Sequence, residues 1–240
     1  MIIAALIIAI VMLSTTSYVL NSEERIVQTQ TSTTLNFDGI KMDIRNTVIS
    51  ALANISNGGS PDVLTSDLIE LLTVLRLQTY ESKFELSFSC SNALPYMNGT
   101  WMSWNNNGSG ISSSYIDSSL NVSGSTESYS LDYATNITTA IAAFSTYAEE
   151  NGQSDVNITY TVNDENGPAL IETLNVYILN SANYSWQNVD PSSYLASVDF
   201  GNGTYSLSFA TPLTNPANIS LQAIDSRGIT VMTNMTSSHV

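Results

Sequence analysis

A chain of 240 residues, 43% of them hydrophobic, can bury a core in one or two domains, and its composition is not that of a disordered protein. Only 11% of the residues are charged, against about 25% in typical soluble proteins. With 21 acids and six Lys or Arg the net charge is −15, and no basic cluster is present, which argues against nucleic acid as a partner.

The first twenty residues are uncharged, and Met1–Leu13 is continuously apolar. As a helix, twenty residues span roughly 30 Å, the thickness of a bilayer core. A secretory signal would have a basic start and a small-residue cleavage site, and neither is present. Two interpretations remain. The segment is a plain single-pass anchor, or it is the N-terminus left after removal of a basic leader, in a subunit whose apolar helices later form a filament core. The residues expected to pack in the membrane or the filament core are Ile2, Ile3, Leu6, Ile7, Ile10, Val11 and Leu13.

A helical stalk is expected to follow the apolar segment. Apolar residues recur every three or four positions from Phe37 to Ile55, and residues 57–61 (Asn-Gly-Gly-Ser-Pro) end the pattern. Residues 1–56 are therefore predicted to form one long helix, or two helices with a hinge. A simpler interpretation of the apolar stripe is that it packs on the chain's own ectodomain. The pair Ser60 and Pro61 begins a second amphipathic helix, expected over residues 60–81.

The region 83–150 is predicted to be rich in β-structure. Apolar and polar residues alternate up to Cys90, as in a strand with one buried face, and this lone cysteine is expected to act as a small buried hydrophobe. Residues 92–128 have the weakest pattern and are expected to be the most loosely ordered part. We expect Trp101 and Trp104 to be buried rather than to form a sugar-binding or surface-binding patch.

Short alternating segments follow one another in residues 151–240 and predict a β-sandwich. They are separated by turn sequences at 164–167, 201–203 and 225–228, and the alternating segments themselves are 156–162, 170–179, 205–209 and 219–223. The predicted fold class is α+β, a long hydrophobic N-terminal helix followed by a mainly β ectodomain.

The C-terminal third resembles immunoglobulin-like domains. Residues 199–207 (Asp-Phe-Gly-Asn-Gly-Thr-Tyr-Ser-Leu) look like the pattern that enters the F strand of these domains, and residues 225–228 resemble their F–G hairpin. The cysteine pair of antibody domains is absent, so the resemblance implies only the wider immunoglobulin-like class of sandwich.

Ten Asn-x-Ser/Thr sequons lie beyond the apolar segment. They are acceptor sites for N-linked sugar if the chain is exported to a glycosylating compartment. A chain so rich in Asn, Ser and Thr contains several by chance, but attached sugar would supply the hydration that a surface poor in charge lacks. The sequon asparagines are Asn54, Asn98, Asn107, Asn121, Asn136, Asn157, Asn183, Asn202, Asn218 and Asn234.

The sequence contains no recognisable catalytic or cofactor-binding constellation. The single histidine, His239, lies in a Ser-rich tail that is expected to be disordered, so triads and metal sites that depend on histidine are disfavoured. Residues 164–167 suit a hairpin turn better than a cation site, and Glu149 with Glu150 suits the solvated end of a helix or strand. We therefore expect a protein that is not an enzyme and has neither cofactor nor metal.

Taken over its whole length, the chain resembles archaeal type IV pilins and related pilin-like surface proteins, in its apolar N-terminal helix, helical stalk and disulfide-free, sequon-rich β ectodomain. Ala5 stands where bacterial pilins usually carry an acidic residue. The resemblance implies an extracellular helical homopolymer for adhesion or surface attachment, whose subunits wait in the membrane before assembly and carry N-linked glycans. The alternative is a single-pass cell-surface glycoprotein with an immunoglobulin-like binding domain.

Overall fold

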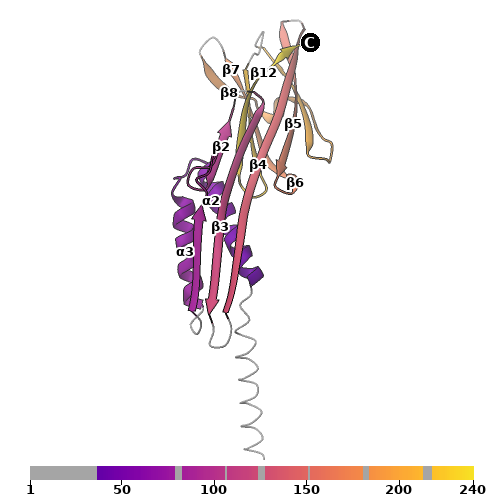
Figure 1. Ribbon diagram of the computed structural model, residues 1–240. Coiled ribbons are helices and arrows are strands. Elements are labelled where there is room, and N and C mark those ends of the chain that lie inside the picture. Colours follow the sequence, from indigo (N-terminus) through magenta and orange to yellow (C-terminus); the bar gives the residue numbers. More distant parts are fainter. Residues whose placement is uncertain are drawn as a thin grey trace, which may run out of the picture. The chain divides into compact units, whose positions relative to one another are not determined.

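The computed structural model describes residues 37–78, 83–105, 107–123, 128–150, 152–180, 184–212 and 218–240 (Figure 1). The predicted membrane or filament-core residues Ile2 to Leu13 lie outside these ranges, and so does Asn183. Among the described helices, none is long and apolar enough to cross a bilayer. The long hydrophobic N-terminal helix therefore stays a prediction. The chain divides into two compact units, Met1–Lys41 and Met42–Val240, and the second contains every described strand.

The helices α2 (Phe37–Ser56) and α3 (Val63–Gln78) follow the predicted pattern. α2 ends where Gly58 takes a left-handed φ of 92° and donates its N–H to the carbonyl of Ile55 at 3.0 Å, as the Asn-Gly-Gly sequence predicts. From residue 44 onward the apolar stripe of α2 is buried, so this face packs within the chain's own folded unit. The buried members of the stripe are Ile44, Val48, Leu52 and Ile55.

The larger sheet, sheet A, joins the two predicted β regions. Its hydrogen-bonded order is β1-β3-β4-β5-β10-β9, with all neighbours antiparallel. Additional short strands pair with β3, β4 and β5. The bounds are β1 (Lys83–Cys90), β2 (Thr100–Trp104), β3 (Ser109–Ser123), β4 (Ser128–Glu150), β5 (Gln153–Asp164), β6 (Gly167–Pro168), β9 (Tyr194–Asp199), β10 (Thr204–Thr211) and β13 (Ser238–His239).

The smaller sheet, sheet B, has the order β12-β11-β7-β8. Its strands are β7 (Ile171–Asn180), β8 (Ser185–Asn188), β11 (Asn218–Asp225) and β12 (Thr230–Thr236), and a short 3₁₀ helix, η1 (Pro191–Ser193), precedes β9. The two sheets pack face to face around one core, which confirms a mainly β sandwich accompanied by helices. The largest core contributions come from Ile158, Leu207, Phe209, Ile219 and Leu221.

β3 and β4 extend beyond the sandwich and, with β1, form a part of sheet A that is covered on one face only. α3 and the part of α2 from Met42 lie along one side of these strands (Figure 1). On the covered face Leu86, Ile116 and Ile137 are buried, whereas the alternate positions are open to solvent. We call this open side the outer face; it carries Ser87, Ser89, Tyr115, Asp117, Ser119, Asp132, Ala134 and Asn136.

Three expectations are wrong. Residues 92–128 contain the ordered strands β2 and β3 rather than a loose segment. Trp104 is 37% exposed and Trp101 is half-buried, so neither is a core residue. The C-terminal tail is not disordered, because β13 pairs in parallel with β4 and the ring of His239 lies 5.1 Å from that of Tyr147.

Candidate functional site

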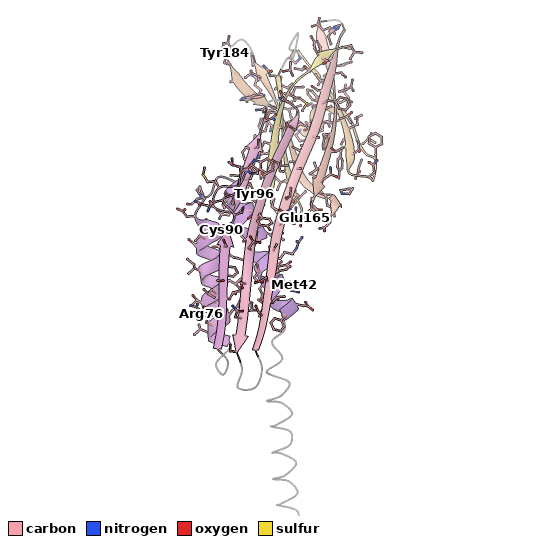
Figure 2. All side chains as sticks on the ribbon, viewed as in Figure 1. Met42, Arg76, Cys90, Tyr96, Glu165 and Tyr184 are labelled. Atoms are coloured by element: carbon pink, nitrogen blue, oxygen red, sulfur yellow. The ribbon has the colours of Figure 1, made fainter. Side chains whose placement is uncertain are left out.

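An ionic cluster, which we call the junction, connects α2 to the β-sandwich. It consists of Arg45, Glu165, Asp225 and Arg227. Glu165 lies in the predicted turn between β5 and β6 and accepts a hydrogen bond from the guanidinium of Arg45 on α2. It also accepts from Nη1 of Arg227, which lies 3.0 Å from Oε1 and 2.8 Å from Oε2 of Glu165. Figure 2 shows Glu165 beside β4, and the backbone N–H of Thr138 on that strand donates to its Oε2 at 3.1 Å.

Arg227 links the junction to the turn between β11 and β12. Its Nε donates to Oδ2 of Asp225 at 2.9 Å, and its Nη2 donates to the carbonyl of Thr138 and to Oγ1 of Thr139 at 2.9 and 3.0 Å. Asp225, whose side chain is only 1% exposed, also accepts the backbone N–H groups of Arg227 and Ile229. The buried carboxylates are therefore paired with charge and with backbone donors, as burial requires.

The electrostatics of Glu165 follow from these contacts. Burial alone would raise the pKa of its carboxyl group. The hydrogen bonds from Arg227, from the backbone and from Arg45 outweigh burial and lower the pKa from 4.5 to about 2. Glu165 is thus ionised at every physiological pH and stays paired with Arg227.

The C-terminal end of α2 is held to β12 by a second set of contacts. Oγ of Ser56 accepts the backbone N–H of Thr230 at 3.0 Å, and Oδ1 of Asn57 accepts from Oγ1 of Thr230 at 2.7 Å. Nδ2 of Asn57 donates to the carbonyl of Gly228 at 3.0 Å. α2 from Met42 onward is therefore fastened to the sandwich at Arg45 and again at its end, and no motif in the sequence signals either attachment.

The described sequon asparagines are scattered over the surface rather than gathered at one place. Those in strands are Asn121, Asn136, Asn157, Asn218 and Asn234, those in loops and turns are Asn98, Asn107 and Asn202, and Asn54 lies in α2. Asn234 is half-buried and the others are exposed. At Asn54 the hydroxyl of the sequon residue Ser56 is buried and accepts the backbone N–H of Thr230. Glycosylation itself stays a prediction.

A cluster of aromatic rings lies at the upper end of the outer face, and we call it the ring cluster. Tyr96, in the loop after β1 (Figure 2), contacts Trp101 edge-on with ring centroids 6.1 Å apart, and its ring centroid lies 5.9 Å from that of Tyr115. The hydroxyl of Tyr96 lies 3.0 Å from Oγ of Ser113. All three rings are half-buried. The sequence singles out Trp101 only together with Trp104, and it contains no signal for either tyrosine.

Cys90, half-buried at the end of β1, lies beside Thr65 of α3. Burial raises the pKa of its thiol, although the hydrogen bond with Thr65 acts in the opposite direction. A thiol in such surroundings has little thiolate character. Within the described ranges no three His, Cys, Asp or Glu side chains come together as a metal site would require.

No protein-family model matches the chain, and no curated protein matches it in sequence. Among solved structures, the chain is similar to the first immunoglobulin domain of the mouse polymeric immunoglobulin receptor. The two are 15% identical, the TM-score is 0.25, and the match covers 42% of this chain and 95% of that domain. A similarity at this level supports no conclusion about function, and the immunoglobulin-like class stays a prediction from the sequence.

Proposed function

We propose that the protein is the structural subunit of an extracellular pilus-like filament, with apolar N-terminal helices bundled in the core and glycosylated β ectodomains facing outward. The apolar, uncharged run from Met1 to Leu20 supports this proposal, because such a segment needs either lipid or other apolar helices around it. In the proposal the subunit waits in a membrane before assembly, polymerises with copies of itself and has no enzymatic activity.

The observation that carries the proposal is the double attachment of α2 to the sandwich. A filament subunit must transmit tension from its core helix to its outer domain, so the two cannot be joined by a flexible linker alone. In the unit from Met42, α2 buries its apolar stripe and is held by Arg45 near its start and by Ser56 and Asn57 at its end. Buried packing combined with charged hydrogen bonds holds α2 from Met42 onward rigidly on the sandwich.

The test is the substitution Ile7→Asp in the full chain, expressed in its native host. A carboxylate inside an apolar helix bundle is strongly disfavoured, so filaments on cells and in the medium should be lost in electron micrographs. Ile69→Asp is the matched control, because Ile69 lies on α3 and is 59% exposed, and that variant should assemble normally. Filaments of normal length and number from Ile7→Asp would contradict the proposal.

One observation favours the alternative of a membrane-anchored surface glycoprotein with a partner-binding domain. Large apolar side chains are exposed on and beside β8 and β9, each the last strand of its sheet: Tyr184, Trp186, Leu195, Val198 and Phe200. Exposed sheet edges with apolar side chains are common binding surfaces. Under this alternative the native protein is a detergent-dependent monomer in the membrane fraction and no filament is seen, whereas the filament proposal requires polymers without detergent.

A further inference from the structure

We infer that the outer face of β3 and β4 is a saccharide-binding surface and that its occupant is the N-linked glycan carried by Asn136. The inference rests on the proposed glycosylation of the ectodomain and goes further, because it assigns one sequon a structural role and gives the ring cluster a ligand. It depends on three features of this face, namely the register of Asn136, the hydrogen bonds of its side chain and a hollow beside it.

The register places Asn136 next to the ring cluster. Asn136 on β4 lies directly opposite Tyr115 on β3, and the next pair on the same face is Thr138 opposite Ser113. Cβ atoms of directly opposed residues are about 5 Å apart, so the first sugar on Asn136 starts beside the ring of Tyr115. Tyr96 contacts both Ser113 and Tyr115, which extends the aromatic surface over the neighbouring strand.

The side chain of Asn136 is already oriented for such a modification. Its Oδ1 accepts a hydrogen bond from Oγ1 of Thr138 at 3.3 Å and lies 3.5 Å from Oγ of Ser113, whose nearer acceptor is the carbonyl of Ile137 at 3.1 Å. No hydrogen bond within the described part of the chain uses Nδ2, the atom to which an N-linked sugar is attached, and the residue is exposed. The amide oxygen thus faces the two hydroxyls, and the acceptor nitrogen is directed away from them.

A hollow of about 460 Å³, where β1, β3 and β4 run side by side, begins at Ala134, the neighbour of Asn136 on the same face of β4. This volume is within the roughly 300–1,000 Å³ typical of small-molecule sites. Its lining includes Ser89, Asp117, Asp132 and Ala134, and Asp117 opposite Ala134 is the next pair on this face after Tyr115 opposite Asn136. A glycan that extends from Asn136 along the strands would therefore enter the hollow.

The chemistry of this face suits a neutral polyol. The rings of Tyr115 and Tyr96 offer apolar surfaces for the C–H faces of a sugar, and the carboxylates of Asp117 and Asp132 accept hydrogen bonds from its hydroxyls. None of the residues that line the hollow is basic, so an anionic ligand is disfavoured. The small side chains of Ser89 and Ala134 leave room above the sheet.

The experiment uses the full chain purified from its native host and from a host that does not glycosylate. Peptide mass spectrometry measures occupancy at each sequon, and circular dichroism measures the Tm of each preparation in detergent. The difference in Tm between the two hosts isolates the effect of the glycans from that of the substitutions. Asn157→Gln is the matched control, because Asn157 is exposed on β5 and lies opposite Thr146 and Ser208 rather than an aromatic residue.

Asn136 should be occupied, and Asn136→Gln should reduce the host-dependent increase in Tm by about 2–4 °C, whereas Asn157→Gln should leave it unchanged. Tyr115→Ala should remove the same increment while Asn136 stays glycosylated, and Tyr115→Phe, which keeps the ring, should retain it. An unoccupied Asn136 beside other occupied sequons would overturn this inference alone, as would equal losses from the Asn136 and Asn157 variants. Absence of sugar from every sequon would overturn the proposed glycosylation as well.

Discussion

Replacing Glu165 by glutamine tests whether the junction stabilises the fold. The substitution keeps the shape of the side chain but removes the charge that Arg227 and Arg45 share, and it leaves Arg227 with Asp225 as its only carboxylate partner within the junction. Glu165 is 12% exposed and Arg227 is 16% exposed, so solvent screens their pair only partly, whereas Arg45 is 35% exposed and contributes less. Loss of hydrogen bonds between buried charged groups costs about 2–3 kcal/mol.

The pKa of Glu165 gives an independent measure of the same interaction. Lowering this pKa from 4.5 in the unfolded chain to about 2 in the folded chain corresponds to roughly 3 kcal/mol of stability. Because the folded-state pKa is depressed, this stability is fully present above pH 4.5 and is lost as the pH falls through about 2. The stability difference between wild type and Glu165→Gln should therefore be about 3 kcal/mol at pH 7 and shrink towards zero at pH 2.

Urea unfolding of the full chain in detergent, followed by near-ultraviolet circular dichroism at several pH values, measures this difference. Glu172→Gln is the control, because Glu172 is exposed on β7, and it should change the free energy of unfolding by less than about 0.5 kcal/mol. A cost of less than about 1 kcal/mol for Glu165→Gln at pH 7 would refute a stabilising junction. An equal cost at acidic and neutral pH would refute the depressed pKa as its origin.

Two further substitutions test the packing of the sandwich by their urea midpoints. Gly110→Ala would place a Cβ atom 1.9 Å from the backbone oxygen of Met232, and should lower the free energy of unfolding by at least about 2 kcal/mol. At Gly152 an added Cβ atom meets open space, so Gly152→Ala should cost only about 1 kcal/mol, which is the strain of a side chain at a φ of 80°. Phe209→Ala removes a fully buried ring and should lower the free energy of unfolding by about 3–5 kcal/mol, while Phe144→Ala, at a residue 63% exposed, should be near neutral. Similar urea midpoints for the two variants of either pair would contradict the packing described.

Elements with a strong local signal were predictable from the sequence. β5, β10 and β11 alternate aliphatic and polar residues over most of their length, and only a strand with one buried face places such residues on one side. The turns after Asp164, Asp199 and Asp225 are marked by nearby Gly or Asn residues, and the end of α2 is marked by Gly58, which adopts a conformation that side chains disfavour.

β3 and the junction could not be predicted, for different physical reasons. β3 carries serine on both faces, including the buried Ser112, Ser113 and Ser114, so its hydrophobicity does not alternate and its period of two is hidden. The junction joins residues 120 positions apart, such as Arg45 and Glu165. Only the folded arrangement of the sheets brings these groups together, and no local pattern encodes it.

Four consecutive residues of β4, 136–139, connect the junction to the outer face. The side chain of Thr139, on the covered face, donates to Asp225 in the junction, and the backbone of Thr138 donates to Glu165 and accepts from Arg227. The side chains of Thr138 and Asn136 point to the outer face and share a hydrogen bond, while Ile137 between them is buried. Because side chains of a strand alternate between its faces, one short segment bonds to the junction, which holds α2, on one side and orients the sequon residue Asn136 on the other. In the proposed filament, tension would therefore pass through the same backbone that positions Asn136.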